Sequence, residues 1–305
     1  MMKRVFNFNA GPSPMPLEVL EAMKEDLTNF KNTGMGITEI SHRSKEFQDM
    51  LDETKDLLGQ LMHLAPDYEI VFVQGGGTMQ FLMTGYNFLH TRAAYADTGV
   101  WAHKARNTAA FFGETYDANS AKDKNYSYIP DTYDIKPDTD YLYICANNTI
   151  YGTVYKELPP VGDKVLIADV SSCALSQPLD ISKFGMVYFG AQKNVAPAGL
   201  VVAIIREDLL GNARPTTPVM MNYQVQADAD SLYNTPPCWC IYICKLVLEW
   251  IKALGGLEAM EKRNREKAKL LYDFLDNSKL FHGTVVPEDR SLMNVPFVTG
   301  NADLD

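Results

Sequence analysis

Short apolar runs that recur through the middle of this chain limit its possible folds more than any other sequence feature. Each run is rich in β-branched and aromatic residues and ends in small or polar ones; the runs are 68–73, 141–145, 164–168, 186–190 and 200–205. Helical patterns or long connections separate most of them. Apolar strands with such connections are typical of a mostly parallel sheet that helices cover on both faces. The sequence therefore predicts an α/β fold around a central sheet.

Helical patterns precede and follow these runs. Pro16 suits a first helical turn, and a second amphipathic pattern starts near Ser44. Helices return after Cys240; one of them ends near the glycine pair 255–256, and the next runs roughly over 257–274. Because glycine pairs interrupt helices, we expect a domain break near residue 256.

We predict two domains on either side of that break. The large domain spans residues 15–256. A small α+β domain combines residues 1–14 with 257–305, and the run 291–298 is interpreted as one of its strands. Because the sequence ends soon after this strand, we expect the small domain to be incomplete.

The charge balance and the apolar pattern exclude several functions. With 28 basic and 38 acidic side chains the formal net charge is −10, which opposes non-specific binding to nucleic acid. The longest apolar run, 200–205, is far shorter than the roughly 20 residues that span a membrane, and no secretion signal opens the chain. The five cysteines, an odd number, favour reduced thiols in the core over disulfides or a metal site. We therefore expect a cytoplasmic protein that holds no metal ion.

A glycine-rich segment, 74–80, follows the first apolar run and opens a helix. Its three consecutive glycines allow close approach of a ligand to the backbone, and the free N–H groups of a helix start attract an anion. The spacing matches neither a dinucleotide fingerprint nor a P-loop. A phosphate site and a plain glycine turn both fit the segment.

Two charged residues follow neighbouring strands. Asp169 comes directly after the run 164–168, and Lys193 comes shortly after the run 186–190. Because ligands of open α/β sheets bind beyond the carboxyl ends of the strands, we expect both side chains to face one crevice. Alone, they could form a structural ion pair. Together with a phosphate site they match pyridoxal phosphate, which needs a lysine to form an imine, a carboxylate for its ring nitrogen and N–H donors for its phosphate.

Four further side chains are candidates near that crevice. Trp101 could stack on a cofactor ring or pack in the core, and Thr149 could bond the cofactor's phenolic oxygen or cap a turn. His42 and Arg43 precede a helix. A cation there opposes the helix dipole, and a guanidinium suits a carboxylate or a phosphate, so binding is favoured over a solvated charge.

Several motifs resemble, in the same order, those of the phosphoserine aminotransferases, a family of class V pyridoxal-phosphate enzymes of fold type I. The resemblance covers the whole chain and rests on the segments 6–12, 40–43, 75–80, 169–172, 190–194, 206–211, 233–237 and 293–297. It implies fold type I, pyridoxal 5'-phosphate as the cofactor, and transamination as the reaction.

The resemblance also implies a role for each candidate around the cofactor. Lys193 would form the imine, and Asp169 would pair with the protonated ring nitrogen. Trp101 would stack on the ring, and Thr149 would bond its oxygen.

The phosphate contacts implied by the resemblance come from two subunits. Gly77, Thr78 and Gln192 would hold the phosphate from within the chain. Asn234 and Thr235 would reach it from the neighbouring subunit, which implies a homodimer with shared active sites.

The implied substrates are small anionic amino acids and keto acids. His42 and Arg43 would bind the distal anion, which is the side-chain carboxylate of glutamate or the phosphate of phosphoserine. The implied reaction transfers the amino group of glutamate to 3-phosphohydroxypyruvate, giving 2-oxoglutarate and O-phospho-L-serine for L-serine biosynthesis. Two alternatives stay open: another class V enzyme that uses alanine or serine with glyoxylate, and a truncated dimer that binds the cofactor without turnover.

Two departures from the family bear on activity. Ala10 stands where family members often have a serine near the substrate. Family members also continue beyond position 305, through a segment whose arginine binds the substrate's α-carboxylate. We therefore expect this chain to bind the cofactor and to be weak or inactive as a catalyst.

Overall fold

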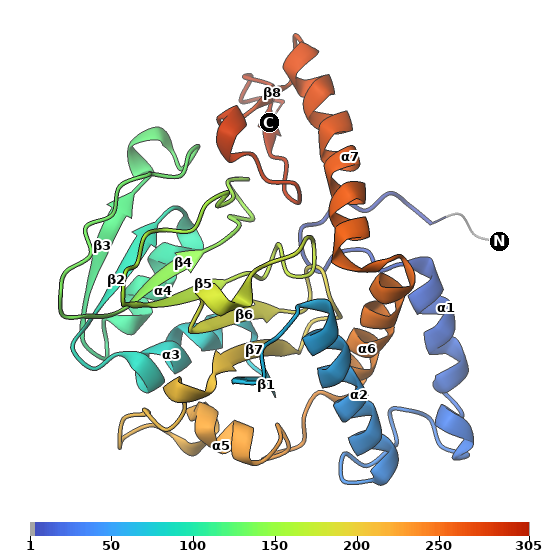
Figure 1. The fold of residues 1–305 in the computed structure, drawn as a ribbon. Coiled ribbons are helices and arrows are strands. Elements are labelled where there is room, and N and C mark those ends of the chain that lie inside the picture. The colour runs from blue at the N-terminus through green and yellow to red at the C-terminus, as the bar shows by residue number, and fades with distance from the viewer. Residues whose placement is uncertain (1–3, 305) are drawn as a thin grey trace.

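A seven-stranded sheet forms the centre of the computed structural model, which describes residues 4–304 (Figure 1). The strands lie side by side in the order β1-β7-β6-β5-β4-β2-β3. Their bounds are β1 Tyr68–Val73, β2 Arg92–Asp97, β3 Glu114–Ser120, β4 Thr139–Cys145, β5 Val165–Asp169, β6 Met186–Gly190 and β7 Val201–Arg206. Every predicted apolar run is a strand of this sheet, so the predicted α/β class is confirmed.

Strand β7 alone runs antiparallel to its neighbours, β1 and β6. The remaining pairs, from β6 through β5, β4 and β2 to β3, are parallel. The connection 191–200 between β6 and β7 is shorter than the dozen or more residues that a parallel crossover requires, so the chain turns back as a hairpin. This hairpin starts at the carboxyl edge of the parallel strands and carries residue 193.

Two strands, β2 and β3, are absent from the sequence prediction. Strand β2 contains three alanines, Ala93, Ala94 and Ala96, all buried. Strand β3 lies at the edge of the sheet and buries only Ala118. Neither strand has the β-branched run on which the prediction relied: the alanines of β2 pack on both faces of the sheet, and an edge strand such as β3 tolerates polar side chains.

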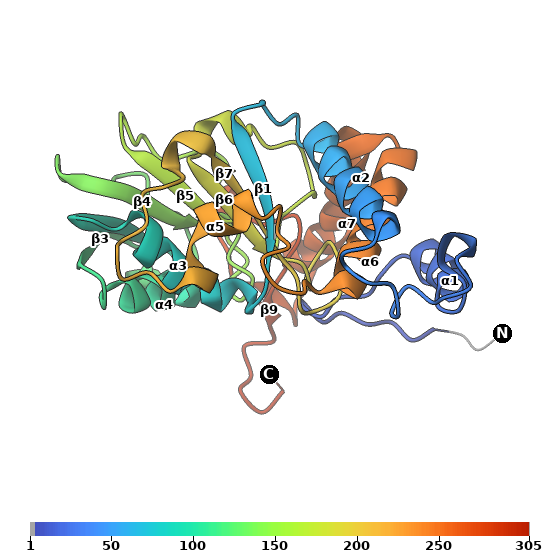
Figure 2. The same cartoon turned by 90° about the horizontal axis from the view of Figure 1, so that it is seen from below.

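Helices cover both faces of the sheet, as predicted (Figures 1 and 2). One face carries α3 Gly76–Phe88, α4 Val100–Ala109 and α5 Tyr223–Asp228, and the other carries α2 Lys45–Leu61 and α6 Cys238–Ala253, with α1 Leu17–Asp26 against α6. Alternate residues of β1 enter different cores. Ile70 and Phe72 belong to the core of α2 and α6, whereas Val71 and Val73 belong to that of α3 and α4, as the two-residue period of a strand requires.

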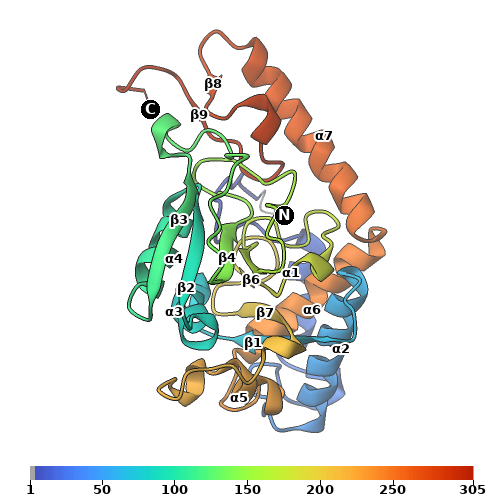
Figure 3. The same ribbon diagram turned by 60° about the vertical axis from the view of Figure 1, so that its left-hand side comes forward.

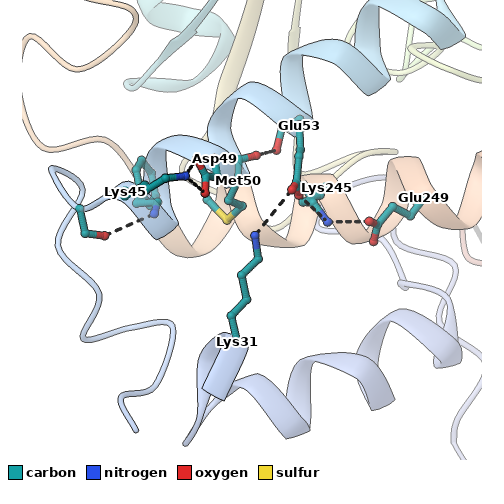
Figure 4. Close-up of polar contacts among 10 residues, drawn as sticks. Lys31, Lys45, Asp49, Met50, Glu53, Lys245 and Glu249 are labelled. Carbon is teal, nitrogen blue, oxygen red and sulfur yellow. Dashed lines mark hydrogen bonds and ion pairs between the residues drawn. The ribbon is translucent and has the colours of Figure 1, made fainter. Parts of the chain in front are cut away.

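Ion pairs at the surface join α2 to α6 (Figure 4). Glu53 of α2 lies 3.6 Å from Lys31 Nζ and 3.2 Å from Lys245 Nζ of α6. Lys245 also pairs with Glu249 on its own helix, at 2.5 Å. Beneath these charges the two helices meet through apolar side chains such as Met50, which is fully buried. The buried apolar contact holds the two helices together, and the ion pairs lie at its edge.

The chain beyond α6 forms a smaller α+β region around α7, Gly256–Asn277 (Figure 3). Strands β8, His282–Gly283, and β9, Phe297–Val298, pair antiparallel there. The predicted strand over 291–298 is therefore wrong in its first part. Ser291 and Asn294 instead use their side chains to bond the large sheet's loops, and Pro296 has no N–H for a ladder.

Short 3-10 turns complete the described elements, at Phe30–Asn32, Lys122–Lys124, Ile181–Lys183, Glu207–Leu209, Val219–Met221 and Pro287–Asp289. Within residues 4–304, none of the helices has the length and apolar character needed to cross a membrane. All five cysteines are free thiols, and Cys240 and Cys244 are buried in α6, as the core interpretation predicts.

Candidate active site

Lys193 lies on the β6–β7 hairpin, close behind the end of β6. Its Nζ donates a hydrogen bond to Thr149 Oγ1 at 2.6 Å. The same nitrogen lies 5.7 Å from the centroid of the Trp101 ring. The hairpin, the turn after β4 and the first turn of α4 thus meet around one half-buried amine.

The start of α3 faces the end of β5. Gly75 precedes α3 in a left-handed conformation, with φ of 91°, which favours glycine and turns the strand sharply into the helix. A Cβ placed on Gly77 would lie 3.8 Å from both Asp169 Oδ2 and Ser171 Oγ. The first-turn N–H groups of Gly77 and Thr78 have no helical partner, so this end of the helix can hold a phosphate.

Asp169 ends β5 and is 7% exposed. Its Oδ1 accepts a hydrogen bond from the Ser171 N–H at 2.8 Å, and no group among residues 4–304 bonds its Oδ2. Burial, followed by the nearby Asp169 charge, raises the pKa of Tyr188 well above its usual value, so this neighbour is neutral. The free Oδ2 therefore has no charged partner in the strand below it and can pair with a cation from a ligand.

Trp101 and Gln192 border the same space. Trp101 is half-buried against the core of α3 and α4, and its Nε1 is buried without a hydrogen-bond partner. The Trp101 ring thus packs against the core, and Lys193 Nζ lies over its face. Gln192 is half-buried, and its backbone carbonyl accepts from Ser13 N at 3.1 Å. This bond fixes the N-terminal segment against the hairpin.

Asn234 and Thr235 lie on the other side of the glycine-rich segment. The Gln74 amide donates to the Thr235 carbonyl at 3.1 Å, and Asn234 lines a cavity of about 300 Å³ together with Gly75 and Gln74. Thr235 is exposed. No described contact joins this pair to Lys193 within the chain.

His42 and Arg43 lie before α2 and make no described contact with Lys193. Arg43 is exposed, and its guanidinium has no hydrogen bond or ion pair to any residue in 4–304. The His42 Nε2 atom is buried and also lacks a partner. His42 and Arg43 thus have polar side-chain atoms that no described residue of the chain bonds, and neither residue belongs to the group around Lys193.

Comparison with known proteins identifies the family. The sequence profile of the class-V aminotransferases matches residues 5–305. The chain belongs to the class-V aminotransferases. A phosphoserine aminotransferase of Bacillus cereus is 48% identical over 308 residues, covering 100% of this chain and 86% of the relative.

Solved structures of related class-V aminotransferases share the fold. The phosphoserine aminotransferase of Bacillus circulans subsp. alkalophilus has a TM-score of 0.96 and 40% identity over 98% of this chain and 84% of that one. The enzyme of Trichomonas vaginalis, solved with pyridoxal phosphate bound, has a TM-score of 0.94 and 36% identity over 99% and 87%. The predicted family and fold type I are therefore confirmed.

Two contacts of this class-V site escaped the sequence analysis. A Cβ on Gly11 would lie 2.9 Å from Lys193 Cγ, so only glycine lets the N-terminal segment lie along the lysine stem. The Ser171 hydroxyl accepts from the Gly190 N–H at 2.9 Å and thereby joins the ends of β5 and β6. Gly11 and Ser171 both lie within motifs that carry the family resemblance, and these motifs were the sequence signal that could have identified the two contacts.

Proposed function

We propose that the chain transfers an amino group between glutamate and 3-phosphohydroxypyruvate, giving 2-oxoglutarate and O-phospho-L-serine, with pyridoxal phosphate as its cofactor. The observation that carries the proposal is the position of the Lys193 amine, bonded to Thr149 and above Trp101, at the edge that also holds Asp169 and the start of α3. Its relatives carry the name of this activity.

The residues present fit the cofactor. The free Asp169 Oδ2 would hold a proton on the ring nitrogen, and Trp101 would cover one ring face. The α3 N-terminus at Gly77 and Thr78, with Gln192, would bind the phosphate. When bound, pyridoxal phosphate supplies an electron-withdrawing ring that stabilises negative charge on the substrate's α-carbon.

Lys193 would serve first as the anchor of the cofactor and then as the proton carrier. Its Nζ would take the proton from the α-carbon and return it to a neighbouring atom, a general acid–base role that typically contributes 10²–10⁴-fold to a rate. Thr149 holds this amine by a 2.6 Å hydrogen bond, and Gly11 confines its stem. The chain thus restricts where the amine can move.

We also propose that the enzyme acts as a homodimer in the cytoplasm. Asn234 and Thr235 make no described contact with Lys193, Thr149 or Trp101 of their own chain, which supports a role at the partner's phosphate. His42 and Arg43 would bind the distal anion with their unmatched donors. Unpaired thiols are typical of a reducing compartment. The assignment of residues 15–256 to a large domain and of 1–14 with 257–305 to a small one stays part of this proposal.

Mixing two inactive variants tests the shared site. Lys193→Ala and Asn234→Ala subunits, unfolded and refolded together, would form hybrid dimers with one site that has both residues intact. We expect activity to return in the mixture while each variant alone stays inactive or weak. If each site lies within one chain, the mixture regains nothing.

The reaction itself is tested with purified chain and added pyridoxal phosphate. We expect glutamate formation from phosphoserine and 2-oxoglutarate, and less from alanine at equal concentration. In the half-reaction without 2-oxoglutarate, Arg43→Gln should lower the rate with phosphoserine at least tenfold relative to alanine, because the distal phosphate loses its partner and alanine has no distal anion. Arg263→Gln removes another exposed guanidinium and serves as the control. A chain that binds the cofactor and forms no glutamate would contradict the proposed reaction and favour the alternative of a dimer that binds the cofactor without turnover.

A further inference from the structure

The turn that carries Thr149 is clasped by a segment from the far end of the chain. Residues 147–154 form this turn, in which Asn147 and Val154 pair as a β-bridge. Residues 289–296 lie along it: the Val154 N–H donates to the Asp289 carbonyl at 2.9 Å, and the Ser291 N–H donates to the Gly152 carbonyl at 2.9 Å. A segment beyond α7 thus supports the partner of Lys193.

The Asn147 side chain is the centre of this contact. It is 2% exposed, and its amide nitrogen donates to Ser172 Oγ and to Asn294 Oδ1, each at 2.7 Å. Its Oδ1 accepts from the Ser291 hydroxyl at 2.5 Å. Ser172 completes the network by donating back to the Asn147 carbonyl at 2.9 Å. We call these four residues the asparagine junction.

The asparagine junction joins three segments of the proposed site. Asn147 lies two residues before Thr149, Ser172 lies three residues after Asp169, and Ser291 and Asn294 belong to the clasping segment. A buried amide with both N–H donors and its oxygen satisfied has one favourable orientation, because any rotation leaves a polar atom unpaired. The junction therefore fixes the Thr149 turn relative to the Asp169 strand end.

We propose that Asn147 is a positioning residue that holds the Thr149 hydroxyl against Lys193 and couples the segment 289–296 to that contact. The proposal deepens the proposed function and rests on it for the role of Lys193. Asn147 touches neither Lys193 nor the space in front of Asp169 in any described contact; it acts through Thr149. The contact makes the geometry of the Thr149 turn depend on Ser291, which lies 144 positions after Asn147.

Variants of the junction can separate positioning from folding. Thr149→Val removes the hydroxyl itself and sets the reference effect. Asn147→Ala removes the side chain of the junction. Asn264→Ala is the matched control, since Asn264 is also 2% exposed and donates one buried hydrogen bond, to the Ser176 carbonyl at 2.8 Å, without joining the Thr149 turn.

The first readout is the pH midpoint of the visible absorbance of bound pyridoxal phosphate. We expect Thr149→Val to move the midpoint, Asn147→Ala to move it in the same direction by at least half as much, and the double variant to add no further shift. Asn264→Ala should leave the midpoint unchanged even if it melts at a lower temperature. An unchanged midpoint in Asn147→Ala, or shifts that add in the double variant, would overturn the proposal.

The second readout needs no cofactor. Hydrogen exchange of residues 147–154 in the cofactor-free chain should become at least tenfold faster in Asn147→Ala and stay the same in Asn264→Ala. If the wild-type chain binds no pyridoxal phosphate, the proposed function fails while this exchange test still decides the positioning role. If Asn147→Ala does not fold, Ser172→Ala removes two hydrogen bonds to Asn147 and Asn294→Ala removes one, and wild-type exchange in both variants would refute the inference.

Discussion

The α2–α6 contact and the asparagine junction both join segments that lie far apart in the sequence, but they use opposite chemistry. Glu53 and Lys245 pair at the surface over an apolar contact, with side chains that are 48% and 14% exposed. Asn147 and Ser291 bond in the interior, at 2% and 0% exposure, and carry no net charge. Solvent screens the first pair and leaves its geometry adjustable, whereas an unpaired atom in the second has no water to replace its partner. The molecule thus uses charge where approximate placement suffices and buried amides where the reacting lysine depends on the placement.

Replacing Lys193 should give the largest loss of activity. The variant tests whether the lysine held by the buried contacts serves catalysis rather than the stability of the fold. Lys193→Ala should reduce transamination by about 10²–10⁴-fold, the usual contribution of a positioned acid–base group. The melting temperature of this variant should stay close to wild type, because within residues 4–304 the amine makes one side-chain hydrogen bond, to Thr149. Steady-state kinetics and thermal melting measure the two quantities. Lys183→Ala, which removes an exposed lysine on a 3-10 turn, is the control; a comparable activity loss there would undermine the comparison.

A methyl group at Gly152 should break the buried clasp directly. Its Cβ would lie 2.3 Å from Pro296 Cδ and 3.0 Å from the Asn294 carbonyl oxygen, at a φ of +79°. Gly152→Ala should therefore lower the free energy of unfolding by about 1–3 kcal/mol and weaken cofactor binding. Gly162→Ala isolates the backbone contribution, since Gly162 has φ of +61° and open space around its Cβ position. If chemical denaturation shows the same loss of unfolding free energy in both variants, the contact between Gly152 and residues 289–296 does not contribute to stability.

The surface contact should be far less sensitive. Lys245→Met removes the ion pairs with Glu53 and Glu249 and should cost about 0.2–1 kcal/mol of unfolding free energy, an effect that shrinks as salt is added. Lys269→Met, which removes an exposed pair with Asp273 on α7, should cost still less. Denaturation at low and high salt measures both. If Lys245→Met lost more unfolding free energy than Gly152→Ala, and equally at low and high salt, the surface contact would be the more sensitive of the two.

The smallest effect should come from acid. Hydrogen bonds from Arg290 lower the pKa of Asp276, so this partly exposed pair stabilises the chain above the pH at which an unfolded aspartate ionises, near 3.9. The contribution is lost as the pH falls through the lower folded pKa. In a plot of unfolding free energy against pH, Asp276→Asn should reduce the slope below about pH 4 and leave the slope near pH 7 unchanged. Melting temperatures across pH 2.5–7, spanning that pKa, check this; identical acid profiles would contradict it.

The sequence predicted most of the sheet because its buried strands are rich in β-branched and aromatic residues. The runs at 68–73 and 186–190, for example, are both strands. The resemblance implied that Lys193, Thr149 and Trp101 surround one cofactor, and in the structure the three side chains lie together. Local patterns alone left Trp101 as a possible core residue and Thr149 as a possible turn cap. Strands β2 and β3 were missed, since alanine-rich and polar strands have no such signature.

The asparagine junction could not be predicted from local patterns. Asn147 and Ser291 are bonded across 144 positions, and neither residue type implies a distant partner. The expected strand over 291–298 even assigned Ser291 and Asn294 to a ladder that does not form there. Likewise, the closeness of Gly11 to Lys193 depends on how the N-terminal segment returns to the hairpin, which only the folded chain reveals.

The order of synthesis gives the clasp a further consequence. A growing chain completes the sheet and both its helix layers once α6 has emerged, yet the Thr149 turn still lacks the bonds from Ser291 and Asn294 at that moment. On the ribosome, the nascent protein would therefore possess the lysine before it possesses the support for that lysine's partner. Pyridoxal phosphate would then bind after residues 289–296 have been translated rather than while the sheet forms.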